Sequence, residues 1–308
     1  MIFVGAGSSF AGSRSIANGR LVFLRFEDTN GESYALYVVK SDGSGARMVS
    51  DAGLHPAWSP DGRMIAYEIA CCPDEGPGIA IVKSDGSGKG RVGASSSAHP
   101  AVDGAPRWSP DGQRIVFETN AAASGLGIQN IHGQRWTPLP LPKRLCGGGP
   151  DWSPDGKRIA FVDSCGRGGS IYVVGLDGTG LRKVASAPLA HDAPSWVFRY
   201  AEFDNVRWSP DGRRLLVSAS GVFGQNPYDA IYFVSPTGGK STLVLRTNVT
   251  SVSWSPDGKR FAYAGGKTCC AIHIFDPAHR RDRTLALTRC RRPARCQDVD
   301  WGRLTTKS

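Results

Sequence analysis

Five segments of the chain carry the same pentapeptide, Trp-Ser-Pro-Asp-Gly: HPAWSPDGRMIAY (residues 55–67), APRWSPDGQRIVF (105–117), GPDWSPDGKRIAF (149–161), NVRWSPDGRRLLV (205–217) and SVSWSPDGKRFAY (251–263). The tryptophans that head these copies, together with Trp301 in the related context DVDWG, recur every 44 to 56 residues. A recurring period of this size is typical of repeat architectures, so it decides which folds are open to the chain.

Each copy predicts a strand, a tight turn and a second strand. Proline at the second position of the turn fixes φ near the value of a type I turn, the Asp side chain caps the turn, and Gly accepts the positive φ that follows. A basic or polar pair comes next, and then apolar side chains typical of a strand. We expect the repeated tryptophan to pack between adjacent sheets, because one indole ring buries a large area.

The outer half of each unit reads as a second hairpin with a Gly-rich turn, as in YALYVVKSDGSGARMV (34–49). The third unit, LGIQNIHGQRWTPL (126–139), is degenerate, and its prolines predict a last strand that ends early. The longest connection spans roughly residues 187–204 and is aromatic. We expect it to be either a flap that packs on the ring or a lip that binds a partner.

The two ends of the chain supply the parts of one further unit. SIANGRLVFLRF (15–26) has no tryptophan strand before it, and QDVDWGRL (297–304) is a tryptophan strand with nothing after it. A ring closes when the last strand completes the first sheet, which leaves no free edge strand. The sequence therefore predicts an all-β fold, a six-bladed β-propeller over residues 19–308. Residues 1–18 are expected to form a short N-terminal segment, which is open to being the remnant of a longer chain.

These WSPDG strands and DGSG hairpins resemble the propeller repeats of the TolB family, also called WD40-like Pro-Asp repeats. The resemblance covers about residues 15–304 and does not include the additional N-terminal α/β domain of TolB. It implies a six-bladed propeller, usually in exported or envelope proteins, that acts by binding other macromolecules. The motif is specific for the fold and weak for function.

The formal net charge of +10 favours acidic partners such as anionic polymers, nucleic acid or phospholipid surfaces. No apolar run approaches the length of a membrane helix, so we expect no membrane span, and we expect a monomer. No secretion signal is evident in MIFVGAGSSFAGSR at the start of the chain. We therefore expect either a trimmed or misassigned start or a cytoplasmic protein.

The eight cysteines fall in two kinds of loop that share one face of a propeller. They are Cys71, Cys72, Cys165, Cys269 and Cys270 in loops between second and third strands, and Cys146, Cys290 and Cys296 in connections into a first strand. We expect a disulfide between Cys146 and Cys165, which bracket one hairpin, and similar pairing of Cys269 or Cys270 with Cys290 or Cys296. An even count on loops favours an oxidising compartment, hence a periplasmic or extracellular location. A metal cluster is the alternative, although the chain has no CxxC pair.

Binding in a propeller is expected at the mouth of the central channel, lined by residues just before each first strand, where the repeats differ. The candidates are His55, Asp103, Arg107, Asp151, Asp204, Asn205, Arg207, Asp298 and Asp300. Carboxylates, arginines and a histidine together suit a peptide or a cation. The alternative is a water-filled channel whose polar groups are all satisfied.

A second candidate is the basic strip RRDRTLALTRCRRPAR (280–295). It contains Arg280, Arg281, Arg283, Arg289, Arg291, Arg292 and Arg295. Arginine binds phosphate or carboxylate through bidentate contacts, which favours an anionic polymer or a lipid headgroup. Nucleic acid fits less well, because aromatic residues do not alternate with the arginines. The alternative is a solvated surface without a partner.

The chain contains no G-x-S-x-G elbow, no H-E-x-x-H motif and no P-loop. We therefore predict a propeller without catalytic residues, cofactor or resident metal, which binds protein or peptide partners in the cell envelope or outside the cell. Two alternatives stay open. One is a propeller lyase or hydrolase that uses channel-mouth carboxylates and a metal, and the other is a propeller fragment of a larger sensor or peptidase.

Overall fold

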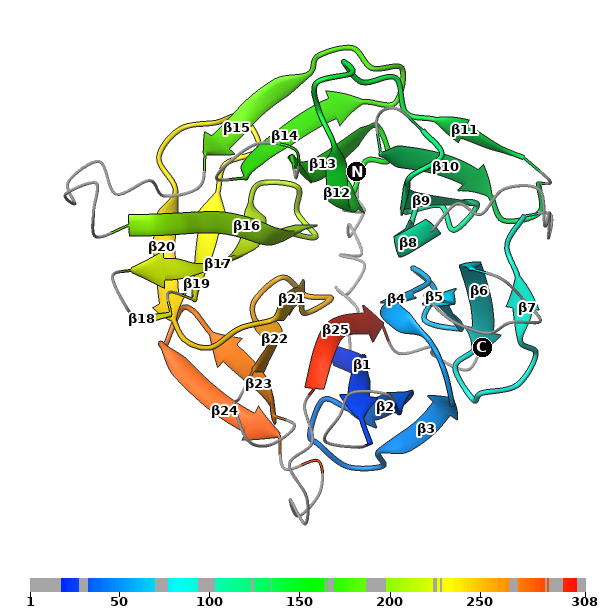
Figure 1. Ribbon diagram of the computed structural model, residues 1–308. Helices are drawn as coiled ribbons and strands as arrows, with labels where there is room; N and C mark the ends of the chain where they lie inside the picture. Colours follow the sequence, from blue (N-terminus) through cyan, green and yellow to red (C-terminus); the bar gives the residue numbers. More distant parts are fainter. Residues whose placement is uncertain are drawn as a thin grey trace, which may run out of the picture.

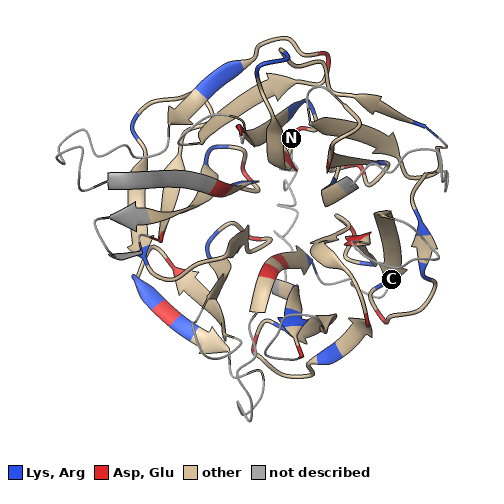
Figure 2. Ribbon diagram, in the orientation of Figure 1, with Lys and Arg blue, Asp and Glu red and all other residues tan. Residues whose placement is uncertain are grey.

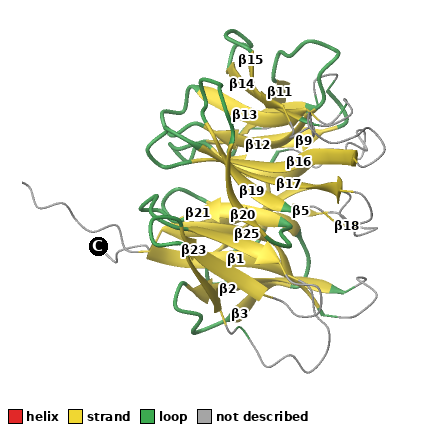
Figure 3. Ribbon diagram, turned by 90° about the vertical axis from the view of Figure 1, so that its left-hand side faces the viewer, coloured by secondary structure: helices red, strands yellow, loops and turns green. Residues whose placement is uncertain are grey.

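The computed structural model describes residues 18–27, 33–69, 77–93, 103–122, 125–133, 135–163, 165, 169–186, 198–223, 226–227, 229–265, 271–285, 287 and 296–303. Within these ranges the strands form six antiparallel sheets, arranged as blades around a central channel (Figure 1). The side view shows strands and connecting loops in this part of the chain (Figure 3). These ranges contain no helix of the length and apolarity that crossing a membrane requires. The prediction of an all-β, six-bladed propeller is confirmed.

Blade 1 combines the two ends of the chain. From the channel outward it contains β25 (Cys296–Arg303), β1 (Asn18–Phe26), β2 (Tyr34–Lys40) and β3 (Arg47–Ser50). Leu21 of β1 lies opposite Trp301 of β25 in an antiparallel register. The C-terminal strand thus closes the ring as predicted, and Figure 1 shows it beside β1 at the channel.

The next three blades follow in chain order, each with its first strand at the channel. Blade 2 contains β4 (Leu54–Trp58), β5 (Met64–Ile69), β6 (Gly78–Lys83) and β7 (Gly90–Arg91). Blade 3 contains β8 (Asp103–Trp108), β9 (Arg114–Thr119), β10 (Leu126–Asn130) and β11 (Trp136–Pro138). Blade 4 contains β12 (Gly147–Trp152), β13 (Arg158–Asp163), β14 (Ser170–Gly175) and β15 (Arg182–Ser186). The short β11 agrees with the early end predicted for the third unit.

Two more blades complete the ring. Blade 5 contains β16 (Phe198–Trp208), β17 (Leu215–Phe223), β18 (Asn226–Pro227), β19 (Ala230–Val234) and β20 (Thr242–Arg246). Blade 6 contains β21 (Ser251–Trp254), β22 (Phe261–Gly265), β23 (Ala271–Asp276) and β24 (Arg281–Leu285).

The aromatic connection predicted at residues 187–204 is partly wrong. Residues 198–204 belong to β16, because they pair with the extended end of β17 in a register that starts with Phe198 opposite Phe223. Backbone pairing with the long strand β17 therefore extends β16 into the segment that was predicted to be a loop. Residues 187–197 lie outside the described residues.

The WSPDG turn is held by the same three hydrogen bonds in all five copies. In the first copy, the Gly62 N–H donates to the Ser59 carbonyl oxygen at 2.9 Å and the Ser59 hydroxyl donates to Asp61 Oδ1 at 2.6 Å. The same Oδ1 accepts the N–H of Arg63 at 3.0 Å. Gly62 has a φ of 69°, in the left-handed region that favours glycine. The predicted roles of Asp and Gly in the turn are confirmed.

The repeated tryptophan packs each blade against the one before it. Trp152 is 4% exposed and lies in a cluster with Val116 and Leu126 of blade 3. Its Nε1 donates to the carbonyl oxygen of Arg107 in blade 3 at 3.1 Å. Trp108 and Trp254 make the equivalent bonds to blades 2 and 5. The predicted packing between sheets is confirmed, and it includes a hydrogen bond that crosses each of these three blade junctions.

In four of the five copies, the second residue after the WSPDG turn is an arginine that covers the tryptophan of the following blade. Arg114 of blade 3 lies over the ring of Trp152, with its guanidinium carbon 4.9 Å from the ring centroid. Arg158, Arg214 and Arg260 stand in the same way over the tryptophans of the next blades. Such cation–π contacts are worth about 0.5–1 kcal/mol at exposed sites and more where water is excluded. Part of the positive charge of the chain is therefore structural.

The closed ring requires glycine at position 302. A Cβ atom on Gly302 would lie 2.4 Å from Cγ of Trp58, which packs directly on it from blade 2. We expect Gly302→Ala to lower the free energy of unfolding by about 1–3 kcal/mol, because the indole has to move away. Urea unfolding measures this change. Gly90→Ala is the control, since a Cβ there meets no atom within 4 Å, and equal midpoints for the two variants would contradict the packing described.

Candidate binding site in the central channel

The predicted channel residues lie inside the first strands of the blades, not before them as expected. The first strands are longer than the sequence suggested, since each starts several residues ahead of its tryptophan. The candidates consequently fall at two depths. One group lies three to five residues before a tryptophan, toward what we call the cysteine end: His55, Asp103, Asp204, Asn205 and Asp298. The other group directly precedes a tryptophan at the turn end, where the WSPDG turns lie: Arg107, Asp151, Arg207 and Asp300.

At the cysteine end, His55 joins two carboxylates from different strands. Its Nδ1 lies 2.7 Å from Oε2 of Glu68 on β5, and its backbone N–H donates to Oδ2 of Asp298 on β25 at 3.4 Å. His55 and Asp298 have φ values of 49° and 52°, in the left-handed region that is sparsely populated outside glycine. Both sit at irregularities in strand pairing, which turn them out of the regular ladder.

Sequence reasoning missed the two glutamates of this end, Glu68 and Glu118. Each stands ten residues after the tryptophan of its repeat, at the end of a second strand. Glu68 is buried beside His55, and Glu118 accepts the backbone N–H of Gly149 from the next blade. Comparing the same repeat position across the copies would have found both, because the other copies have Val, Ser and Ala there.

The electrostatics of this cluster favour a charged imidazole. Burial alone would lower the pKa of His55, but the negative charge of Asp298, the hydrogen bond to Glu68 and the charges of Glu68 and Glu118 overcome it. Together they raise the pKa of His55 to about 9. The imidazole is therefore charged near neutral pH.

The remaining predicted residues of the cysteine end make separate contacts. Asp204 Oδ1 accepts the hydroxyl of Ser220 at 2.8 Å, within blade 5. The side-chain oxygen of Asn205 is buried, with no hydrogen bond among the described residues. The side chain of Asp103 lies outside what the structure describes. The structure thus joins His55 to Asp298, whereas the contact of Asp204 with Ser220 lies within blade 5.

At the turn end the channel widens into a cavity of about 210 Å³. All four predicted residues of this end line it, together with Ser253 and the exposed Arg303. The cavity therefore holds charged groups of both signs that come from four of the blades.

The carboxylates of the cavity are already committed to hydrogen bonds between blades. Asp151 Oδ2 accepts the backbone N–H of Trp208 at 2.7 Å, and Asp300 Oδ2 accepts that of Trp58 at 2.8 Å. The second oxygen of Asp300 accepts the hydroxyl of Ser253 at 2.9 Å. Each of these tryptophans belongs to the following blade, so the acids that line the channel also tie neighbouring blades together.

The arginines of the cavity are bound to backbone carbonyls through one nitrogen each. Arg107 Nη1 donates to the carbonyl oxygen of Pro106 at 2.9 Å and to that of Pro56 at 3.3 Å. Arg207 Nη1 donates to the carbonyl oxygen of Val206 at 2.7 Å. Both arginines are 6% exposed. The guanidinium groups are thus fixed in position within the wall of the channel.

Asp151 is the most perturbed acid of the channel. Burial raises its pKa to about 7, against the opposing effects of the Trp208 N–H and the charge of Arg107, while Asp300 adds to the rise. Near neutral pH, Asp151 therefore carries a partial negative charge.

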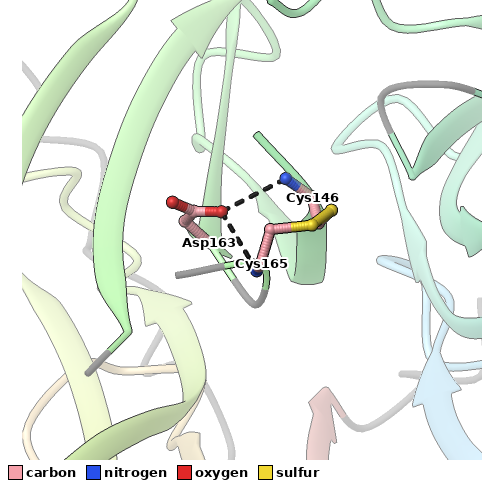
Figure 4. Close-up of a disulfide and its surroundings, with 3 residues drawn as sticks. All are labelled: Cys146, Asp163 and Cys165. Atoms are coloured by element: carbon pink, nitrogen blue, oxygen red, sulfur yellow. Dashed lines mark hydrogen bonds between the residues drawn. A yellow bond between two sulfur atoms is a disulfide. The ribbon is translucent and has the colours of Figure 1, made fainter. Parts of the chain in front are cut away.

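One disulfide ties the cysteine end of blade 4. Cys146, just before β12, is joined to Cys165, just after β13, with their Cα atoms 5.1 Å apart. Oδ1 of Asp163 accepts the backbone N–H of both cysteines, at 3.2 and 3.3 Å (Figure 4). Cys296 is also disulfide-bonded. The predictions for Cys71, Cys72, Cys269, Cys270 and Cys290 fall on residues that the structure does not describe.

The described part of the basic strip lies on β24, at the outer edge of blade 6 (Figure 2). Arg281 and Arg283 are exposed, with Asp282 between them, and Arg283 Nη2 donates to the carbonyl oxygen of Ser41 at 2.6 Å. Arg280 is exposed at the turn before the strand. Arg289, Arg291, Arg292 and Arg295 lie outside the described residues. Acidic and basic charges therefore alternate on this strand.

Metal binding finds no support in the described ranges. No three His, Cys, Asp or Glu side chains in this part of the chain gather closely enough to hold a metal ion.

The pKa of His55 predicts a titration that can be observed directly. We expect its imidazole signals in NMR spectra to titrate with a midpoint near pH 9. Because this folded-state pKa lies above the ordinary value of about 6.5, the cluster stabilises the fold below pH 6.5 or so, and that contribution is lost as pH rises to 9. Asp298→Asn should lower the midpoint, and a midpoint near 6.5 in the unaltered chain would refute the charged cluster.

A family model described as "WD domain, G-beta repeat" matches residues 239–276. The search of curated proteins finds no match. Among solved structures, TolB from Acinetobacter baumannii superposes with a TM-score of 0.70 at 17% identity, covering 92% of this chain and 66% of that one. This chain thus spans somewhat less than two thirds of that TolB.

Two further solved structures share the architecture. A nidogen/laminin complex matches with a TM-score of 0.64 at 14% identity, over 94% of this chain and 100% of that one. An oligogalacturonate lyase in complex with manganese matches with a TM-score of 0.54 at 15% identity, over 81% of this chain and 70% of that one. At identities this low, the structural similarity shows the fold alone and does not indicate the function. The chain has a TolB-like six-bladed β-propeller fold.

Proposed function

We propose that this propeller is a non-catalytic binding protein, which takes a protein or peptide partner at the turn end of the channel. The observation that carries the proposal is the cavity of about 210 Å³ with its fixed charged wall. Pockets for whole small molecules usually measure about 300–1,000 Å³. A smaller cavity suits one side chain or one chain end that a larger partner presents.

The state of the acids favours binding over catalysis. General acid–base work needs carboxyl groups that can reach a substrate and exchange protons with it. Asp151 and Asp300 instead each hold a backbone N–H of the next blade, so moving them would loosen the junction. An enzyme that uses these carboxylates and a metal remains the alternative, with a manganese-bound lyase among the structural neighbours.

A protein partner is also in keeping with the structural neighbours. One of them is the nidogen/laminin complex, in which the similar chain is part of an assembly of proteins. We place the function in the cell envelope or outside the cell, because the disulfide between Cys146 and Cys165 belongs in an oxidising compartment.

The location predicts the oxidation state of the cysteines. We expect protein made in an oxidising host to show few free thiols after alkylation and mass spectrometry, with peptides that link Cys146 to Cys165. In the chain-entropy model, a disulfide that closes a loop of this size raises the free energy of unfolding by about 3 kcal/mol. Eight free thiols would contradict the proposed compartment.

Selection from a random peptide display library tests the binding function. We expect peptides that bind the unaltered propeller and lose most of their affinity for Pro210→Trp, because Pro210 lines the cavity and is exposed, so that an indole there would cover the mouth. Met48→Ala is the matched control, since Met48 is an exposed residue on the outer strand β3. If selected peptides bound all three proteins equally well, the channel mouth would not be the binding site.

A further inference from the structure

Two buried cations line the same cavity and form no salt bridge within the described part of the chain. Arg107 and Arg207 are each 6% exposed, and they stand in blades 3 and 5, on either side of Asp151 in blade 4. In the described part of the chain, no carboxylate oxygen lies within 4.0 Å of a nitrogen of either guanidinium group. The two groups are held by backbone carbonyls and are not paired as salt bridges.

The hydrogen-bonding capacity of both groups is largely unused. Each guanidinium group has five N–H donors, and the bonds found within the described residues all leave from Nη1. Nε of each arginine is buried, with no partner in this part of the chain. A buried charge that lacks a direct ion pair and leaves donors unused is costly, so an anion that binds to these donors would stabilise the site.

We propose that the turn-end cavity is an anion site in which Arg107 and Arg207 together bind a carboxylate that the partner presents. The proposal rests on the proposed function for the source of that carboxylate, which is either a C-terminus or an Asp or Glu side chain. Nε and Nη2 of both arginines are the donors left over, because the backbone carbonyls are bound by Nη1.

The number of donors favours a carboxylate over a phosphate. Asp151 and Asp300 share the cavity with the arginines, so an incoming anion meets their negative charge as well. A dianionic phosphate would be repelled by these acids and attracted by the arginines about twice as strongly as a monoanion, so the match between oxygens and donors makes the difference. A carboxylate carries one charge on two oxygens, which match one donor from each arginine. The partial protonation of Asp151 near neutral pH reduces this repulsion further.

Formate is a suitable probe, because it is a carboxylate small enough for the cavity. With ¹⁵N-labelled arginine, we expect the side-chain signals of Arg107 and Arg207 to shift as sodium formate replaces sodium chloride at constant ionic strength. Arg107→Gln and Arg207→Gln should each weaken formate binding at least about tenfold, as expected for loss of a charge-assisted hydrogen bond. Arg281→Gln removes the same charge from exposed β24 and should leave the affinity unchanged.

Each outcome decides the proposal. Absence of formate-induced shifts in the unaltered protein overturns the proposal. This outcome does not depend on whether any variant folds. Equal formate affinity in all three variants also overturns it, and so does tighter binding of phosphate than of formate.

The peptides selected at the channel mouth separate the two sources of the carboxylate. Loss of binding on amidation of the C-terminus identifies a terminal carboxylate, and loss on replacement of Asp and Glu by Asn and Gln identifies a side chain. No loss in either case refutes a carboxylate ligand while the peptide-binding function stands. Formate binding that depends on both arginines, with no peptide binding at the mouth, would instead keep the anion site and refute the proposed function.

Discussion

The packing of one tryptophan against the preceding blade is the interaction on which the rest of the structure depends. The indole fills the junction, its Nε1 donates across three of the junctions, and an arginine of the preceding blade covers its ring. The backbone N–H of the same residue bonds, in three blades, to the side chain that precedes the neighbouring tryptophan. One residue per blade therefore fixes both the angle between sheets and the wall of the channel.

Because of this arrangement, side chains that line the channel also hold neighbouring blades together. Asp151 and Asp300 are placed like ligand-binding groups, yet each completes a hydrogen bond that its blade junction requires. Arg107 and Arg207 occupy the equivalent position in blades 3 and 5, where backbone carbonyls bind only one nitrogen of each guanidinium group. The residue type at this one repeat position thus distinguishes acids that stabilise the ring from arginines with unused donors.

The fold was predictable because its determinants are local and repeated. A five-residue turn specifies each hairpin. The unpaired tryptophan strand at residues 297–304 indicates that the ring closes by pairing with β1. The pairing of Cys146 with Cys165 follows from the same counting of strands. The site was less predictable, because the contacts of His55 with Glu68 and Asp298 depend on bulges that single-sequence patterns do not reveal. The extension of β16 was missed for a related reason, since it depends on the partner strand β17.

The union of β25 with β1 also has a consequence for how the molecule is made. During synthesis, β1 has no partner strand on its channel side until β25 has been made, because Leu21 of β1 pairs with Trp301 of β25. Contacts this distant in sequence form slowly, and an open sheet edge invites association with other chains in the meantime. A chain in which β25 has not yet been made therefore exposes the inner edge of β1 to misassembly.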